Sequence, residues 1–113
     1  MKNKNSELIK KKCRPCEGDI PPLSDIEIGN FKRQINEDWQ VINNNKIIKD
    51  YAFVNYNRTI DFVNKVAAIA EEEGHHPVMH VYYGKVQIEL WTHAIDGLSE
   101  NDFILAAKID LLF

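Results

Sequence analysis

The sequence has no long apolar segment. Its hydrophobic runs fall well short of the roughly 18 residues that a membrane-spanning helix needs, and its polar beginning does not contain the apolar stretch of a secretory signal peptide. These features argue against a membrane-spanning protein and favour a cytoplasmic one.

The chain also lacks an excess of positive charge. Its 17 Asp and Glu residues outnumber its 14 Lys and Arg residues, and the net charge is −3. Nucleic acid and membranes are therefore not expected as principal partners, because both usually attract a basic surface. Positive charge is dense only at the start, in Lys2, Lys4, Lys10, Lys11, Lys12 and Arg14. Short charged termini are usually solvated, so we expect residues 1–20 to form a basic, flexible tail and residues 21–113 to form the domain.

Cysteine is scarce, and both cysteines lie in this tail. Cys13 and Cys16 have the C-x-x-C spacing of a redox pair or of half a zinc site. The Lys-rich sequence before them and Pro21-Pro22 after them do not resemble the strand and helix that flank a thioredoxin-type pair. A zinc ion would need two more ligands, and the nearest histidine is about sixty residues away. We expect two reduced thiols.

The chain contains enough apolar residues for one hydrophobic core and thus one domain, since its 113 residues are 44% hydrophobic and 27% charged.

The first helix is predicted from Ser24-Asp25-Ile26-Glu27, which is a capping box, and it should end near Asn36. Residues 39–42 and 46–54 are predicted strands of a hairpin with a turn of three asparagines.

A second helix is expected to follow this hairpin. Asn55 or Asn57 is a candidate N-cap, and Gly74 suits the C-terminal end. The expected buried stripe of this helix consists of Ile60, Val63, Ala67 and Ala70.

A second hairpin is predicted from residues 78–83 and 86–93. In its second strand the core face should carry Val86, Ile88, Leu90 and Thr92, which places His93 off the core face. A last helix begins at Ser99, where Ser99-Glu100-Asn101-Asp102 is an Asp variant of the capping box. The order αββαββα predicts an α+β domain with a four-stranded antiparallel sheet and helices packed on one face.

All four histidines, His75, His76, His80 and His93, lie between residues 75 and 93, in or next to the second hairpin. Histidine changes charge near physiological pH, so such clustering favours acid–base chemistry or a metal site. Pairing across the second hairpin should bring residues 76–78 opposite residues 91–93. His80 lies within a strand, where an exposed histidine needs no function.

A zinc site with an open water position remains an alternative for three histidines. Its usual spacings, H-x-H and H-x-x-x-H, aim both rings in one direction, whereas adjacent histidines such as His75 and His76 do not. From the residues alone, acid–base or ligand-binding histidines are favoured over a metal site and over surface histidines.

The motifs around these histidines resemble the signature of the pterin-4a-carbinolamine dehydratases. They are Glu71-x-x-x-His75-His76-Pro77, Tyr83-x-x-Val86 and Thr92-His93-x-x-x-Gly97-Leu98-Ser99-x-x-Asp102. The resemblance covers residues 23–112, and the C-x-x-C tail is similar to that of many bacterial members. The chain departs from the family at Val78-Met79, where an acidic residue and a tryptophan are common.

The resemblance implies the loss of water from a 4a-hydroxytetrahydropterin made by an aromatic amino acid hydroxylase, with neither a metal nor a cofactor. His75 and His93 would transfer protons, His76 would chiefly bind substrate, and Glu71 would orient His75. The implied substrate-binding residues are His75, His76, Pro77, Thr92, His93, Ala94 and Ile95.

The alternative is a binding module, because some animal relatives also act as dimerisation cofactors through the last helix. We expect that helix to expose an apolar stripe that forms a homodimer or homotetramer. The stripe consists of Phe103, Ile104, Ala107 and Leu111.

Overall fold

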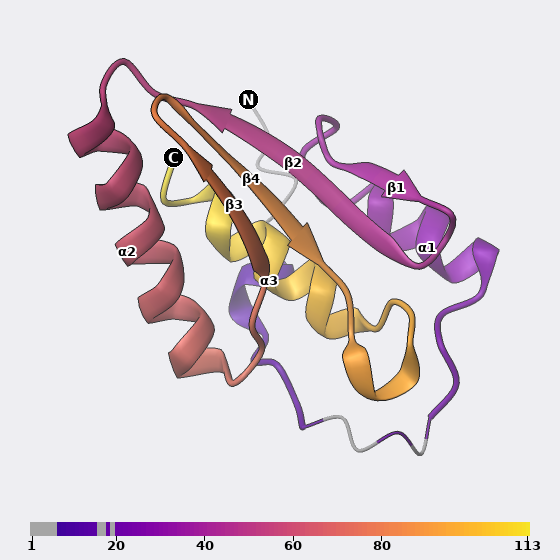
Figure 1. The fold of residues 1–113 in the computed structure, drawn as a ribbon. Coiled ribbons are helices and arrows are strands. Elements are labelled where there is room, and N and C mark those ends of the chain that lie inside the picture. The colour runs from indigo at the N-terminus through magenta and orange to yellow at the C-terminus, as the bar shows by residue number, and fades with distance from the viewer. Residues whose placement is uncertain (1–6, 16–17, 19) are drawn as a thin grey trace.

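A four-stranded antiparallel sheet with three α-helices on one face forms the domain, which confirms the predicted α+β class (Figure 1). The computed structural model describes residues 7–15, 18 and 20–113; Lys2, Lys4 and Cys16 lie outside them. The strand order is β1-β2-β4-β3. The elements are η1 (Leu8–Lys10), α1 (Asp25–Lys32), β1 (Gln40–Ile42), β2 (Lys46–Ala52), α2 (Tyr56–Glu73), β3 (Val78–Tyr82), β4 (Lys85–Leu90), η2 (His93–Ile95) and α3 (Glu100–Asp110).

Local signals set the helix ends. The backbone N–H of Glu27 donates to the hydroxyl of Ser24, and the N–H of Ser24 donates to the Glu27 carboxylate, as a capping box requires. The Asn55 side chain caps α2 by accepting from the Arg58 N–H. Gly74 ends α2 with a φ of 68°, a left-handed conformation that favours glycine. The helix α1 stops at Lys32, one turn before the predicted end.

In the predicted buried stripe of α2, Ala70 is buried as expected, but the other buried positions lie one residue earlier than predicted. Ala67 is exposed, and Ile60 and Val63 lie only at the flank of the buried face. The stripe is Thr59, Phe62, Val66, Ala70 and Glu73. Both sets have helical spacing, and the choice between them depends on how α2 packs on β3, β4 and α3.

The second hairpin has the predicted faces but a different register and length. Val86, Ile88 and Leu90 have no exposed surface, as expected for the core face. However, β4 ends at Leu90, and Val78 pairs with Glu89, which shifts the predicted register by two residues. The predicted strand residue His93 instead begins the short 3-10 helix η2.

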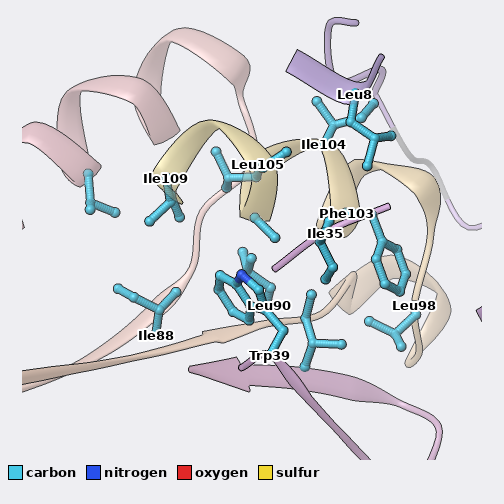
Figure 2. Packing of buried hydrophobic residues seen from close by; sticks show 14 of the residues in the cluster. Leu8, Ile35, Trp39, Ile88, Leu90, Leu98, Phe103, Ile104, Leu105 and Ile109 are labelled. Atoms are coloured by element: carbon cyan, nitrogen blue, oxygen red, sulfur yellow. The ribbon is translucent and has the colours of Figure 1, made fainter. Parts of the chain in front are cut away.

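The last helix, α3, is buried on nearly every side rather than along one stripe. Phe103, Ile104 and Ala107 pack inside the chain, and of the predicted stripe only Leu111 is exposed (Figure 2). The prediction that this stripe is an exposed subunit interface is therefore wrong.

The N-terminal segment contacts one side of α3, so the expected solvated tail is only partly observed in residues 7–15: its cations are exposed, but two of its side chains are buried. Leu8 has no exposed surface and lies beside Ile104 in the core (Figure 2). Cys13 is also buried. Lysines dominate the segment, but the burial of the apolar Leu8 side chain against α3 is enough to hold the segment on the domain. Among the described residues, no helix is long and apolar enough to cross a membrane.

Candidate active site

Three of the four histidines gather around one cavity of about 330 Å³. It lies at the end of the molecule where α2 turns into β3 and where β4 runs into the loop 91–98 (Figure 1). The lining residues are Arg14, Gly74, His75, His76, Thr92, His93, Ala94 and Asn101. The predicted convergence of the two histidine segments is thus confirmed, even though the strand register that suggested it is shifted.

His75 is held by a buried carboxylate. Its Nε2 atom lies 2.6 Å from Oδ1 of Asp102, and the two side chains are 12% and 0% exposed. The other oxygen of Asp102 accepts from the Thr92 hydroxyl at 2.8 Å and from the Ser99 N–H at 3.0 Å. Because every contact of this carboxylate is with a donor, it can fix the orientation of the His75 ring.

Asp102 reaches this position because α3 begins at Ser99. An acidic residue three positions after an N-cap folds back on the cap N–H. The capping box therefore leaves the second carboxylate oxygen of Asp102 to face His75. The sequence showed the cap, but it did not show that a distant histidine shares it.

Glu71 contacts His76 rather than His75, which corrects the predicted pairing. The Oε1 atom of Glu71 lies 2.8 Å from Nε2 of His76, and these side chains are 82% and 63% exposed. The prediction assumed that a residue four positions later lies one helical turn away. Because Gly74 ends α2, the chain reverses direction before His75.

His93 also lines the cavity. It is exposed at the start of η2, and its ring packs against Trp91 with centroids 4.0 Å apart and an interplanar angle of 31°. The loop that carries it is closed by backbone hydrogen bonds between Thr92 and Gly97. Contact with Trp91 and the closed loop limit the orientations of this ring, which suits a proton donor or acceptor.

Two predicted substrate-binding residues, Pro77 and Ile95, are half-buried and do not line the cavity. Two residues that were not predicted, Arg14 and Asn101, do line it. In the sequence, these two residues were marked only by their neighbours. Asn101 directly precedes Asp102 of the family motif, and Arg14 lies between the two cysteines of the C-x-x-C motif.

His80 lies away from the cavity, as expected. Its Nε2 atom is 2.5 Å from Oε2 of Glu89, a residue that also accepts from Lys46. The hydrogen bond from His80 is the main reason why the pKa of Glu89 is below its ordinary value, and Lys46 adds to it.

Within the described residues, no three His, Cys, Asp or Glu side chains lie close enough together to bind a metal ion. The C-x-x-C motif falls partly outside them, at Cys16. Burial raises the pKa of the Cys13 thiol to about 12.

An α+β domain with three histidines lining one cavity and a buried carboxylate in contact with one of them defines a class of acid–base or ligand-binding protein. The family model described as "Pterin 4 alpha carbinolamine dehydratase" matches residues 21–112, and the chain belongs to this family. A protein of Rickettsia canadensis named "Putative pterin-4-alpha-carbinolamine dehydratase" is 50% identical over 103 residues, which are 91% of this chain and 94% of that protein. A protein of the same name from Nitrosospira multiformis is 52% identical, over 95% and 93% of the two chains.

Solved structures agree with this fold. A "transcriptional coactivator/pterin dehydratase" from Brucella melitensis has a TM-score of 0.75 and 26% identity, and the match covers 80% of this chain and 97% of that chain. A pterin dehydratase-like protein identified as a RuBisCO assembly factor in the alpha-carboxysome has a TM-score of 0.55 and 29% identity over 66% and 84%. The fold is thus shared with proteins to which more than one role is attributed.

Proposed function

We propose that this protein removes water from 4a-hydroxytetrahydropterin and releases quinonoid dihydropterin. The main supporting observation is that one cavity is lined by His75, which contacts the buried Asp102, and by His93. Family membership supplies the substrate class. The hydroxylated pterin would come from an aromatic amino acid hydroxylase, so the protein would support tetrahydropterin recycling in the cytoplasm by supplying the dihydropterin for a separate reduction.

The reaction needs one base and one acid. The proton on ring nitrogen N5 leaves, a double bond forms between N5 and C4a, and the C4a–O bond breaks as the hydroxyl is protonated to water. Each well-placed proton-transfer group contributes about 10²–10⁴-fold to the rate.

Asp102 suggests how the two roles are divided. A carboxylate beside Nε2 of His75 holds a proton on that nitrogen, which leaves Nδ1 as the atom that accepts a proton. The same carboxylate stabilises the imidazolium that forms. His75 is therefore the proposed base for N5, and His93 is the proposed acid for the departing hydroxyl.

His76 serves substrate binding in this proposal. It lines the cavity, and the exposed Glu71 carboxylate limits the orientations of its ring. The predicted peptide segment at Thr92 and Ala94 lines the same cavity and can contact the flat pterin ring.

The direct test is to follow carbinolamine dehydration by purified, EDTA-treated protein. Wild-type protein should be active, and His75→Ala and His93→Ala should each lower kcat by about 10²-fold or more. His80→Ala is the matched control, because His80 lies outside the cavity, and it should keep full activity. Full activity of both cavity variants would refute the proposed roles. Stoichiometric zinc that is lost together with activity on chelation would favour the metal alternative.

A binding role is the second candidate, favoured by the roles attributed to the two solved relatives, coactivator and assembly factor. The exposed apolar side chains suited to a partner lie around the end of the edge strand β3, not on α3. They are Val54, Tyr56, Val81, Tyr82 and Tyr83. This surface also supports the proposal of a homodimer or homotetramer. Light scattering distinguishes these states, and Tyr83→Ser should shift the mass toward the monomer if this surface joins the subunits.

A further inference from the structure

The wall of the cavity includes a residue of the N-terminal segment to which the proposed reaction gives no role. Arg14 lines the cavity together with His75, His76 and His93. Among the described lining residues, Arg14 is the one with a permanent positive charge, because guanidinium stays protonated throughout the physiological pH range. Its neighbours in the wall are neutral residues and histidines.

Both backbone polar groups of Arg14, its N–H and its carbonyl oxygen, are hydrogen-bonded to the domain. The Asn101 side chain accepts from the Arg14 N–H at 2.9 Å and donates to the Arg14 carbonyl oxygen at 2.6 Å. Asn101 is buried, so its hydrogen bonds are not replaced by water without cost. The position of Arg14 is therefore built into the fold.

A second attachment lies one residue earlier. The N–H of Cys13 donates to Oε1 of Glu73 at 2.8 Å, and Lys108 donates to Oε2 of the same buried carboxylate at 2.7 Å. Together with the burial of Leu8, these contacts connect residues 8–14 to the end of α2 and to α3. Figure 1 shows the segment passing the end of the molecule where the cavity lies.

Consecutive residues in the first turn of α3 hold two parts of the cavity wall. Asn101 binds the backbone of Arg14, and Asp102 binds the ring of His75. The spacing between Arg14 and the proposed base is thus set by one rigid helical turn.

We propose that Arg14 belongs to the active site and binds oxygen atoms of the pterin substrate. This inference rests on the proposed function. The substrate has a carbonyl oxygen on the carbon next to C4a, and a dihydroxypropyl side chain would bring hydroxyls near N5, because the side chain is attached to the ring carbon next to N5. Both kinds of oxygen flank the reacting atoms that His75 and His93 would serve, and a guanidinium donates readily to such acceptors.

Steady-state kinetics of Arg14 variants test this proposal. Arg14→Ala should raise KM about tenfold and change kcat by less than about twofold, because it removes a binding contact and leaves the proton-transfer groups in place. Arg14→Lys should recover part of the loss. Lys10→Ala is the matched control, since Lys10 is an exposed cation of the same segment that does not line this cavity. An unchanged KM in Arg14→Ala would overturn the proposal.

Two substrates identify the oxygen that Arg14 contacts. One carbinolamine carries a dihydroxypropyl side chain and the other carries a methyl group. A KM effect with both substrates assigns the contact to the ring carbonyl, and an effect limited to the first assigns it to the side-chain hydroxyls. Both results support Arg14 as a binding residue.

Asn101→Ala tests the positioning of Arg14. It should raise KM as Arg14→Ala does, and the double variant should be no worse than the weaker-binding single variant, because both changes remove the same contact. Circular dichroism should show an intact fold. Additive effects in the double variant would refute the role of Asn101 in holding Arg14.

Binding of a dihydropterin, measured by calorimetry, separates this inference from the proposed function. If wild-type protein shows no dehydratase activity, the proposed function is wrong. Weaker dihydropterin binding by Arg14→Ala would still support Arg14 as a pterin-binding residue. Equal affinity of the two proteins would refute that role.

Discussion

The Nε2 atom of His75 lies 2.6 Å from Oδ1 of Asp102, a carboxylate with no exposed surface. His75 follows the end of α2, and Asp102 lies in the first turn of α3. Thr92, which lines the cavity next to His93, donates to the other oxygen of Asp102. Asp102 therefore joins the segments that carry the two proposed proton-transfer histidines.

Asp102→Asn should lower kcat about 10–100-fold, because an amide can neither hold the proton on Nε2 of His75 nor stabilise its imidazolium as a carboxylate does. The measurement is carbinolamine dehydration over a range of pH, in which a shifted profile distinguishes an effect on His75 from a loss of folded protein. Asp96→Asn is the control, since Asp96 is an exposed carboxylate of the nearby loop. Equal kcat for Asp102→Asn and wild type would contradict this role.

Glu71→Gln should raise KM by about threefold or less and leave kcat nearly unchanged. The reason is that Glu71 contacts His76 and that this pair is mostly exposed, so it contributes little. Steady-state kinetics of Glu71→Gln and Asp102→Asn under the same conditions compare the two carboxylates directly. A larger fall in kcat for Glu71→Gln than for Asp102→Asn would restore Glu71 as the partner of His75.

Glu73→Gln should lower the free energy of unfolding by about 1–3 kcal/mol at neutral pH, because Glu73 is buried and accepts from both Cys13 and Lys108. Urea unfolding measures this difference. Glu72→Gln is the control; its side chain is exposed, and it should change the free energy by less than about 0.5 kcal/mol.

The effect of Glu73→Gln should depend on pH. Burial by itself would raise the pKa of Glu73, but hydrogen bonds from Lys108 and Cys13 outweigh it and leave the pKa below the ordinary 4.5. A carboxylate with a lowered folded pKa stabilises fully above its unfolded pKa and loses this contribution as pH falls through the folded value. The difference between the variant and wild type should therefore shrink below about pH 4.5. A difference that is constant down to acid pH would contradict the ion pair.

Leu8→Ala should lower the free energy of unfolding by about 2–5 kcal/mol, the usual range for a leucine with no exposed surface. Ile26→Ala is the control, because Ile26 is 77% exposed, and it should have little effect. Thermal or urea unfolding provides the comparison. If both substitutions have equally small effects, the N-terminal segment does not contribute to the core.

Several features could be predicted because they depend on neighbours in the sequence. The Ser24 and Ser99 capping boxes, the Asn55 cap and the Gly74 terminus each need only three or four consecutive residues. The alternation of Val86, Ile88 and Leu90 likewise needs only one strand. These local signals predicted the number, type and order of the α-helices and strands, but not the two 3-10 helices.

Other features could not be predicted because they depend on contacts between distant segments. The pairing of His75 with Asp102 spans 27 positions, and the hydrogen bonds between Arg14 and Asn101 span 87. The one-position error in the buried stripe of α2 and the two-residue error in the hairpin register have the same origin. In each case several local solutions satisfy the pattern, and packing against another element selects one.

The sequence by itself determined the α+β class, the element order and the set of histidines from which a site can be built, because periodicity and capping act over a few residues. Tertiary structure decided which carboxylate supports which histidine, that α3 is enclosed, and that Arg14 lines the cavity. The physical reason is that burial and hydrogen bonding depend on distances in space, and only the packed helices and sheet bring His75 to Asp102 and Arg14 to Asn101.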